Sequence, residues 1–417
     1  MTTTPSFPRK RAASDSRMAV QSSGFVRLGD CCKFYSGGTP AKGTAQYWNG
    51  DIPWFSPKDI KTFDLCVAQD RISKLAIAES ATQLIMPGTI LVVGRSGVLA
   101  HTLPVGIVRQ PSTFNQDIKA IVPSDAFDPE FVALYLRAKQ PHVLADGVKR
   151  GPTVHSLVAN FLEDLEIPTL QLPEQRHIAA RLKAQLAEVD TARQAAQAQV
   201  REAGLLRQRL LRQTFDALHD APRKVLGEWA KTTSGSTPPR GDKRYWSPAE
   251  IPWVKTGEVA FAPISTTEEA ISRQALEECS LTLLPPQSVL IAMIGQGKTR
   301  GQSAILQIEA VTNQNCFAIL PNDSWDATFL YHWLMASYKD LRELSASRGG
   351  SQSALNGALL NALEIPAPDI DTQRHLVTRL QAQLAQADAI AHAAAAQLAE
   401  IERLPQRLLA KAFAAPA

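Results

Sequence analysis

The chain has 417 residues, of which 45% are hydrophobic and 20% are charged, and its formal net charge at pH 7 is +4. This composition excludes a disordered protein, and the lack of any run of about 18 apolar residues excludes a transmembrane helix. At about 150 residues per domain, the length predicts two or three domains. The slight excess of basic residues permits nucleic-acid binding without requiring it.

The cysteines and the N-terminal residues indicate where the protein resides. The five cysteines form no Cys-x-x-Cys pair, so neither a disulfide framework nor a zinc site has support. Residues 1–20 carry Arg9-Lys10-Arg11 among Ser, Thr and Pro, and they lack the apolar segment of a secretory signal. We therefore predict a flexible N-terminal tail on a cytoplasmic protein.

Beyond the tail, the chain divides into four segments of two alternating kinds. Residues 21–170 and 219–368 combine short apolar runs with Gly and Pro, which predicts compact domains of mixed α/β structure. Residues 171–218 and 369–417 are rich in Ala, Leu, Gln and Arg, which predicts one long helix in each. The predicted fold class is therefore α+β, with two tandem-repeated domains joined by two long helices.

The two halves of the chain repeat each other at an offset of about 198 residues. Residues 36–40 read Ser-Gly-Gly-Thr-Pro and residues 234–238 read Ser-Gly-Ser-Thr-Pro, and a Tyr-Trp and an Ile-Pro-Trp follow each of them. Further along, an Asn-Gln, an Arg-Gly, an Ile-Pro and a Gln-Arg-His recur in the same order in both halves. A constant offset over so many segments indicates an internal duplication.

Each long helix carries one apolar stripe. A helix of about 40 residues is about 60 Å long, so the stripe extends beyond a single domain and predicts that the two helices pair. The chain connections make this pair antiparallel, as a coiled-coil spacer with approximate two-fold symmetry. The alternative is that each helix packs on its own domain. Pro405 should kink or shorten the second helix. The predicted pairing residues are Ile178, Leu182, Leu186, Val189, Leu376, Leu380, Leu384 and Leu398.

One segment resembles an enzyme motif. Gly297-Lys298-Thr299 matches the end of a phosphate-binding P-loop, so a nucleotide-binding enzyme is an alternative function. The complete motif has a glycine where this chain has Ala292, and a helix where it reads Arg-Gly-Gln-Ser. No Asn-Pro-Pro-Tyr-like methyltransferase motif, dinucleotide fingerprint or His-Glu-x-x-His occurs. We therefore predict no catalytic residue, no metal site and no cofactor in this chain.

Two polar loops, residues 94–97 and 295–301, combine glycines with side chains suited to phosphates and guanine edges. Solvated hairpin tips have the same composition, and either loop alone indicates such a tip. The presence of such a loop in both copies makes DNA binding an equal alternative. Basic residues beside the Ile-Pro-Trp and Arg-Gly motifs are candidates too, with ordinary surface lysines as the alternative. The candidate DNA-binding residues are Lys58, Arg95, Ser96, Arg150, Thr153, Lys255, Gln296, Lys298, Thr299, Arg300, Arg348 and Ser351.

Other repeated residues are predicted to be structural. The tryptophans of the Tyr-Trp and Ile-Pro-Trp motifs should lie in the core, and the Asn-Gln pairs should fix a turn through buried hydrogen bonds. His177 and His375 should pack or cap at the starts of the long helices. The tryptophans concerned are Trp48, Trp54, Trp246 and Trp253.

The two copies differ most in residues 59–82 and 258–280, and in the two polar loops. Because the segments around these differences match between the copies, we predict that the two domains recognise two unlike half-sites on duplex DNA. If both domains enter the major groove from one side, the half-site centres lie about 10 base pairs apart.

These duplicated motifs, in this order, resemble the specificity subunit of type I restriction-modification systems over nearly the whole chain beyond residue 20. Among the features that carry the resemblance are residues 173–178, Pro-Glu-Gln-Arg-His-Ile, and residues 371–376, Asp-Thr-Gln-Arg-His-Leu. The resemblance implies two target recognition domains, a helical spacer that fixes the gap between half-sites, and no catalytic activity in this chain.

The resemblance also implies the partners. They are double-stranded DNA, two modification (methyltransferase) subunits and restriction subunits, with no membrane. S-adenosylmethionine, ATP and Mg would then serve the partner subunits rather than this chain. Within the same fold, the alternative is a specificity subunit that serves a fused restriction-methylation polypeptide.

Overall fold

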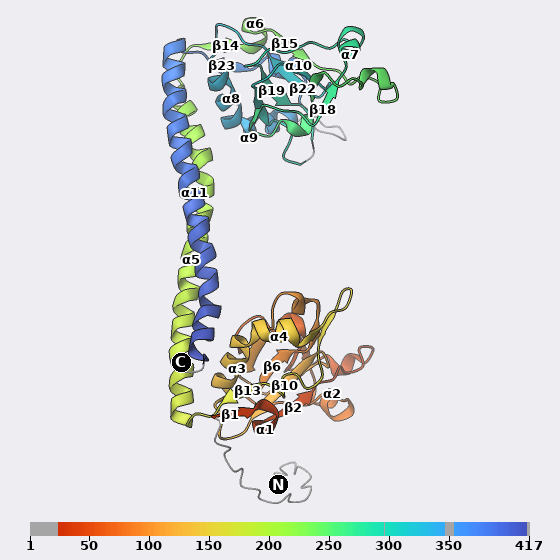
Figure 1. Cartoon of the computed structure of the whole chain (residues 1–417), viewed down its shortest axis with the longest axis vertical. Helices are drawn as coiled ribbons and strands as arrows, with labels where there is room; N and C mark the ends of the chain where they lie inside the picture. Colours follow the sequence, from red (N-terminus) through yellow and green to blue (C-terminus); the bar gives the residue numbers. More distant parts are fainter. Residues whose placement is uncertain (1–23, 296, 347–353, 415–417) are drawn as a thin grey trace, which may run out of the picture. The chain divides into compact units, whose positions relative to one another are not determined.

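The structure is a computed structural model and describes residues 24–295, 297–346 and 354–414. It forms two compact units, each of which contains one globular domain and part of both long helices (Figure 1). Unit 1 comprises the chain up to Gln194 together with the chain from Ala399 onward, and unit 2 comprises Ala195–Leu398.

The domain of unit 1 is built on a mixed five-stranded sheet with the order β2-β10-β6-β8-β4. Only the β4 and β8 pair within this sheet is parallel. Two three-stranded sheets, β5-β3-β9 and β11-β12-β7, and the two-stranded pair β1-β13 complete the domain. The strands are β1 (Phe25–Arg27), β2 (Cys32–Ser36), β3 (Ile52–Phe55), β4 (Asp64–Leu65), β5 (Asp70–Ile72), β6 (Ile90–Val93), β7 (Arg95–Ser96), β8 (Val105–Val108), β9 (Thr113–Phe114), β10 (Ile118–Pro123), β11 (Val148–Lys149), β12 (His155–Leu157) and β13 (Glu166–Pro168).

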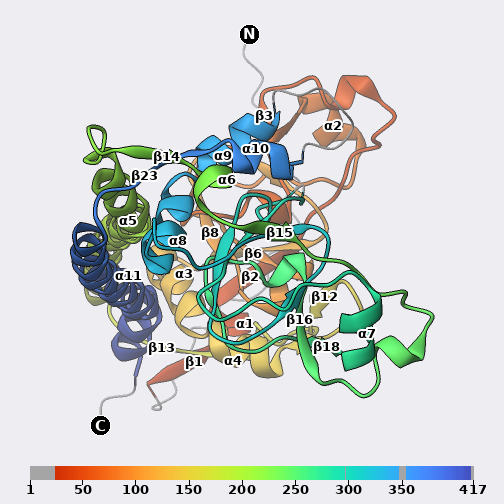
Figure 2. The same ribbon diagram turned by 90° about the horizontal axis from the view of Figure 1, so that it is seen from above.

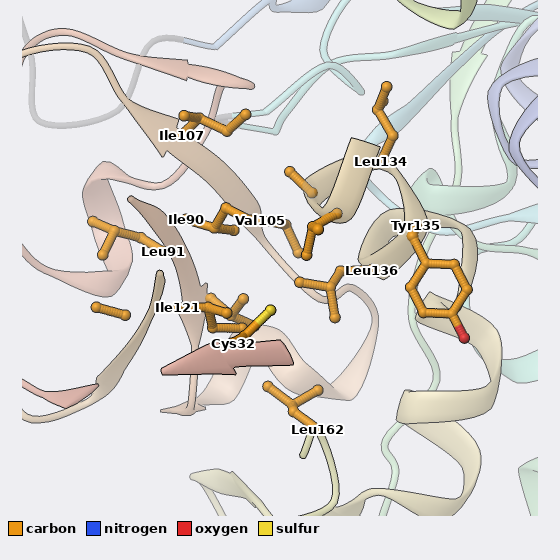
Figure 3. Packing of buried hydrophobic residues seen from close by; sticks show 14 of the residues in the cluster. Cys32, Ile90, Leu91, Val105, Ile107, Ile121, Leu134, Tyr135, Leu136 and Leu162 are labelled. Carbon is orange, nitrogen blue, oxygen red and sulfur yellow. The ribbon is translucent and has the colours of Figure 1, made fainter. Parts of the chain in front are cut away.

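Helix α3 covers the main sheet of this domain. It begins at Pro129, whose fixed φ suits the first helical position, and the side chain of Asp128 caps it by accepting hydrogen bonds from two backbone N–H groups. Figure 3 shows Leu136 of α3 pointing toward Ile121 and Val105 of the sheet, and all three are buried. The helices are α1 (Leu28–Cys31), α2 (Lys74–Glu79), α3 (Pro129–Ala138) and α4 (Gln140–Asp146), with 3-10 helices η1 (Ala45–Tyr47), η2 (Pro57–Asp59) and η3 (Gly97–Ala100).

The domain of unit 2 repeats this plan. Its main sheet has the order β15-β22-β19-β20-β17, with β18-β16-β21 and β14-β23 beside it. The described residues of this unit contain no counterpart of the β11-β12-β7 sheet. The strands are β14 (Arg223–Val225), β15 (Thr232–Ser234), β16 (Ile251–Val254), β17 (Pro263–Ile264), β18 (Glu269–Ile271), β19 (Val289–Ala292), β20 (Ser303–Leu306), β21 (Val311–Thr312), β22 (Cys316–Ile319) and β23 (Glu364–Pro366). The helices are α6 (Leu226–Trp229), α7 (Arg273–Glu278), α8 (Ala327–Ala336), α9 (Tyr338–Ala346) and α10 (Gly357–Asn361), with η4 (Lys243–Tyr245) and η5 (Thr256–Glu258).

The two long helices are α5 (Leu172–Asp216, 45 residues) and α11 (Ile370–Ala412, 43 residues). Within each unit the described stretches of the two lie side by side (Figures 1 and 2). In unit 2, the end of α5 joins the start of α11 in one core cluster, which includes Phe215 and Leu380. Arg207 precedes Phe215 in α5, and it forms an ion pair at 2.9 Å with Asp388, which follows Leu380 in α11. The course of the pair is therefore antiparallel, as predicted.

The same pairing occurs in unit 1, where Leu182 near the start of α5 joins Leu409 near the end of α11 in the domain core. The ring of Phe413, just beyond α11, contacts Phe131 of α3 at 5.3 Å between centroids. The helix ends thus pack on the domains as well as on each other, because their apolar stripes are wide enough to face both.

Pro405 does not shorten α11, which continues to Ala412. A proline within a helix removes one N–H donor, and the helix here continues into a segment that packs in the core of unit 1 through Leu409. The predicted α+β class, the tandem repeat and the antiparallel long helices are confirmed. Of the two effects expected of Pro405, the shortening does not occur and the kink stays a prediction.

Candidate nucleic-acid interface

The repeated motifs of unit 1 contact one another and build a rigid frame. The Thr39 hydroxyl donates a hydrogen bond to the side-chain oxygen of Gln116 at 2.6 Å. The indole N–H of Trp54 donates to the Gly38 carbonyl at 3.0 Å. Gly37 lies so close to the Phe114 carbonyl that a Cβ atom would be 2.2 Å from that oxygen, so only glycine fits.

Unit 2 has the same frame. The Thr237 hydroxyl donates to Gln314 at 2.5 Å, and the Trp253 indole donates to the Ser236 carbonyl at 3.0 Å. A Cβ atom on Gly235 would be 1.7 Å from the Thr312 carbonyl oxygen. The short motifs therefore stabilise each domain internally, and the residues that differ between the copies lie outside these motifs.

All four tryptophans take part in this frame, but of those predicted to lie in the core Trp48 and Trp246 are only half-buried. Trp54 and Trp253 are buried, and each packs edge-on against the tryptophan of the preceding Tyr-Trp motif, with centroids 5.1 and 5.3 Å apart. The asparagines fix their turns, since the side-chain oxygens of Asn115 and Asn313 accept backbone N–H groups two residues on. The four indole N–H groups donate to backbone carbonyls, so these side chains help to hold the frame.

In unit 1, the small sheet β11-β12-β7 presents a row of polar side chains. Arg95 of β7 and Lys149 of β11 lie directly opposite Ser156 of β12, one on each side of it. Side chains at opposite positions project from the same face of a sheet, and both cations are exposed. Two cations flanking a hydroxyl can contact successive phosphates or a base edge.

The turn between β11 and β12 lies against the loop that begins with β7. A Cβ atom on Gly97 would be 3.1 Å from the Thr153 carbonyl, so the two segments are in contact there. The structure thus brings the candidates Arg95, Ser96, Arg150 and Thr153 into one region, although about 55 residues separate them in the chain.

Lys149 and Ser156 were not among the residues predicted from the sequence to bind DNA. Lys149 directly precedes the candidate Arg150, so the pair of adjacent basic residues was an available signal. Ser156 had none, because its place at the centre of the sheet depends on the pairing of strands distant in sequence.

A hollow of about 260 Å³ lies beside this polar row. Arg95, Gln116 and Lys119 line it, and the Lys119 ammonium donates a hydrogen bond to the Ser36 hydroxyl at 2.8 Å. Lys119 therefore adds a third cation near Arg95 on the surface of the main sheet.

Lys58 and Lys255, at equivalent places after the Ile-Pro-Trp motifs, both form ion pairs with carboxylates. Lys58 lies 3.0 Å from Asp70, and Lys255 lies 2.6 Å from Glu268 and 3.1 Å from Glu269. The hydrogen bond to Glu268, followed by that to Glu269, raises the pKa of Lys255. These lysines lie outside the β11-β12-β7 sheet and carry their own counter-charges.

In unit 2, the loop between β19 and β20 carries the remaining described candidates. Lys298 is exposed and Thr299 is half-buried, whereas Arg300 is only 8% exposed, so its side chain faces the protein rather than solvent. Gln296, Arg348 and Ser351 lie outside the described residues. The loop leads into strand β20 rather than a helix, so a P-loop is not formed and the nucleotide-binding alternative is not favoured.

The predicted pairing residues take two kinds of position on the long helices. Leu182, Leu380 and Leu384 are at most 4% exposed, and they belong to the core clusters of their units. Ile178, Leu186 and Leu376 pack against the same clusters, and Val189 and Leu398 are half-buried.

At the starts of the long helices, His177 and His375 are exposed, and the buried side chains are instead Gln175 and Gln373. His375 Nδ1 lies 2.8 Å from the Asp371 carbonyl within its own helix. The prediction that the histidines of the Gln-Arg-His motif pack or cap there was wrong, and the glutamines of the motif are the buried residues.

The described ranges lack the features of a metal site and of a membrane span. No cluster of three or more His, Cys, Asp or Glu side chains there has a geometry that could hold a metal ion. None of the helices described there is both long enough and apolar enough to cross a membrane.

Comparison with known proteins agrees with this architecture. The family model of the type I restriction modification DNA specificity domain matches residues 22–200 and again residues 223–402. The EcoR124I/EcoR124II specificity subunit of Escherichia coli is 34% identical over 152 residues, which are 36% of this chain and 38% of that protein. The MjaIX specificity subunit of Methanocaldococcus jannaschii is 25% identical over 295 residues, 65% of this chain and 66% of that protein. The chain thus matches less than two thirds of the length of either relative.

Solved structures share the fold. A chain from a study of complex assembly in the type I R-M system superposes with a TM-score of 0.69 at 21% identity, covering 93% of this chain and 97% of that one. The HsdS subunit from Thermoanaerobacter tengcongensis superposes with a TM-score of 0.63 at 20% identity, covering 94% and 97%. Because the family model accounts for both repeats and for most of the sequence, the chain belongs to the type I restriction modification DNA specificity domain family.

Proposed function

We propose that the chain is the non-catalytic DNA specificity subunit of a type I restriction-modification system, and that it recognises an asymmetric bipartite target. The observation that carries this proposal is the contrast between frame and loops. The Thr39–Gln116 and Thr237–Gln314 bonds hold equivalent frames, whereas the loops that follow β6 and β19 differ in sequence and structure. Two frames with unlike loops suit two unlike half-sites.

In unit 1, the polar row of Arg95, Ser156 and Lys149 is our proposed DNA-contacting surface, with Arg150 and Thr153 in the adjoining turn. In unit 2, Lys298 and Thr299 take this role. Phosphate contacts from such cations make binding depend steeply on salt concentration.

The activities of such a system would belong to partner subunits. We propose that two methyltransferase subunits, which use S-adenosylmethionine, and restriction subunits, which use ATP and Mg, assemble on this chain in the cytoplasm. Apolar side chains left exposed on the long helices support a docking role. In unit 2, Leu205 is 44% exposed, and Ile390 is 52% exposed beside a hollow of about 580 Å³.

Methylation sequencing of cells that express the chain with its neighbouring methyltransferase, compared with cells that lack the chain, tests the proposal. We expect an asymmetric split motif that is methylated on both strands only when the chain is present. If a motif is methylated equally without the chain, or if the purified complex binds DNA with no dependence on sequence, the proposal is wrong.

A further inference from the structure

The first residue of α4 and of α9 holds a loop in place in each unit. The loops concerned connect β6 to β8 (residues 94–104) and β19 to β20 (residues 293–302), and we call them loop 1 and loop 2. Gln140 and Tyr338 are equivalent in the repeat, since they lie 198 residues apart, and both begin the helix that follows the one covering the main sheet. They are chemically different, yet each bonds the loop of its own domain.

In unit 1, the side-chain oxygen of Gln140 accepts two hydrogen bonds from the end of loop 1. The Leu103 backbone N–H and the Thr102 hydroxyl both donate to it at 3.0 Å. Arg95 lies at the start of the same loop and remains exposed. Gln140 therefore holds the end of loop 1 through Thr102 and Leu103, while Arg95 at the start of the loop stays exposed.

In unit 2, the Tyr338 hydroxyl donates a hydrogen bond to the Lys298 carbonyl at 2.6 Å. One turn further along α9, the Arg342 guanidinium donates to the Arg300 carbonyl at 3.0 Å. The Tyr338 ring is itself fixed edge-on against Phe261, with centroids 5.2 Å apart. Both bonds are to backbone carbonyls, so the exposed ammonium group of Lys298 remains free to face a ligand.

The two loops differ in how much they depend on these bonds. Loop 1 buries Leu99 and Leu103, each 2% exposed, in the core of its domain. Loop 2 buries Met293 at its start in the core of unit 2, but its later part buries the polar residues Arg300 and Gln302. Without comparable leucine anchors in that part, loop 2 relies more on its hydrogen bonds to α9.

We propose that Gln140 and Tyr338, with Arg342 beside Tyr338, are positioning residues that set the DNA specificity of their own domains without touching DNA. This inference rests on the proposed function, because it assumes that loops 1 and 2 read the two half-sites. Loss of a positioning bond lets the loop sample other conformations, which weakens discrimination between bases more than it weakens overall binding.

The test uses the full chain in complex with its methyltransferase partner and a panel of duplexes with single base changes in either half-site. Tyr338→Phe removes only the hydroxyl and keeps the ring contact with Phe261. We expect it to lower discrimination at one half-site by roughly two- to tenfold, the loss of about one hydrogen bond, and to leave the other half-site unchanged. Gln140→Leu should lower discrimination at the other half-site only. Arg342→Met should lower discrimination at the same half-site as Tyr338→Phe.

Tyr245→Phe is the matched control, since Tyr245 also lies in unit 2 and its hydroxyl donates to Glu278 at 2.9 Å. It should keep full discrimination at both half-sites. Unchanged discrimination in Tyr338→Phe, Arg342→Met and Gln140→Leu overturns the inference, and so does equal loss at both half-sites together with a lower unfolding temperature. If the wild-type complex itself shows no sequence preference, the proposed function fails and this inference fails with it.

Discussion

Gln175 and Gln373 make the same three hydrogen bonds in the two units, and neither side chain is exposed to solvent. The amide oxygen of each accepts a bond from the backbone N–H of the residue that caps α3 or α8, Asp128 or Asp326, at 2.8 Å. The amide nitrogen donates to two backbone carbonyls, which are those of Ala126 and Leu170 in unit 1 and of Ser324 and Pro368 in unit 2. Each glutamine thereby fastens the start of a long helix to its domain.

Replacing Gln373 by methionine should destabilise unit 2. Methionine is close to glutamine in size, so the change removes three hydrogen bonds and leaves one N–H and two carbonyls buried without those partners. We expect a loss of roughly 2–4 kcal/mol in the free energy of opening of α8, measured by native-state hydrogen exchange. Gln381→Met, at an exposed position of the same helix, is the control and should leave that value unchanged. Equal values for the two variants would show that the buried bonds contribute nothing.

His332 of α8 makes the stability of unit 2 depend on pH. It is 5% exposed, its Nδ1 has no hydrogen-bond partner among the described residues, and the first copy has Leu134 at this place. Burial, followed by the nearby Arg207 charge, lowers the pKa of His332 from 6.5 to about 4. The folded state therefore disfavours the protonated imidazole. The stability that neutral, buried His332 contributes to unit 2 is complete above pH 6.5 and is lost as the pH falls toward 4.

His332→Leu should remove this dependence. Between pH 6.5 and pH 4, unit 2 of the wild type should lose on the order of 3 kcal/mol more than the variant does, which corresponds to the shift of its pKa. Unfolding by urea at a series of pH values measures the difference. Parallel pH profiles for the two proteins would contradict the prediction.

Gly235 should tolerate no side chain. A Cβ atom there would lie 1.7 Å from the Thr312 carbonyl oxygen, whereas Gly241 has no atom within 4 Å of the equivalent position. We expect Gly235→Ala to destabilise unit 2 by at least about 2 kcal/mol and Gly241→Ala to have little effect. Thermal unfolding compares the stability of the two variants directly. Similar unfolding temperatures would contradict the prediction and would mean that the backbone around Gly235 shifts to accommodate a methyl group.

Arg95→Ala and Lys149→Ala should each weaken DNA binding by the complex. If each side chain contacts one phosphate, each substitution lowers the slope of log K against log salt by about 1. Fluorescence anisotropy over a range of salt concentrations measures both quantities. Lys74→Ala, which removes an exposed lysine of α2 outside the β11-β12-β7 sheet, is the control. An equal change of slope in all three variants would contradict the proposal that the β11-β12-β7 sheet contacts DNA.

The sequence predicted the features that depend on local pattern. Fixed motif spacing identified the duplication, and the apolar stripes identified α5 and α11 because helical periodicity is visible within a few turns. The structural role of Trp54 and Trp253 was likewise predictable, since aromatic residues between apolar neighbours are normally buried.

The features that the sequence left undecided depend on contacts between distant segments. Lys149 and Ser156 became part of the candidate site only because β11, β12 and β7 pair, and the burial of Arg300 follows from its packing within unit 2. The role of Gln373 depends on chain reversals that bring Ser324, Asp326 and Pro368 around one amide.

Thus the sequence by itself determined the internal duplication, the long antiparallel helices and the family, because motif spacing and helical periodicity are visible in the sequence. The tertiary structure alone decided which polar side chains face solvent together, and that Gln140 and Tyr338 hold the two loops. Strand pairing and side-chain hydrogen bonds join residues whose separation in the chain follows no local rule, so only the folded chain identifies them.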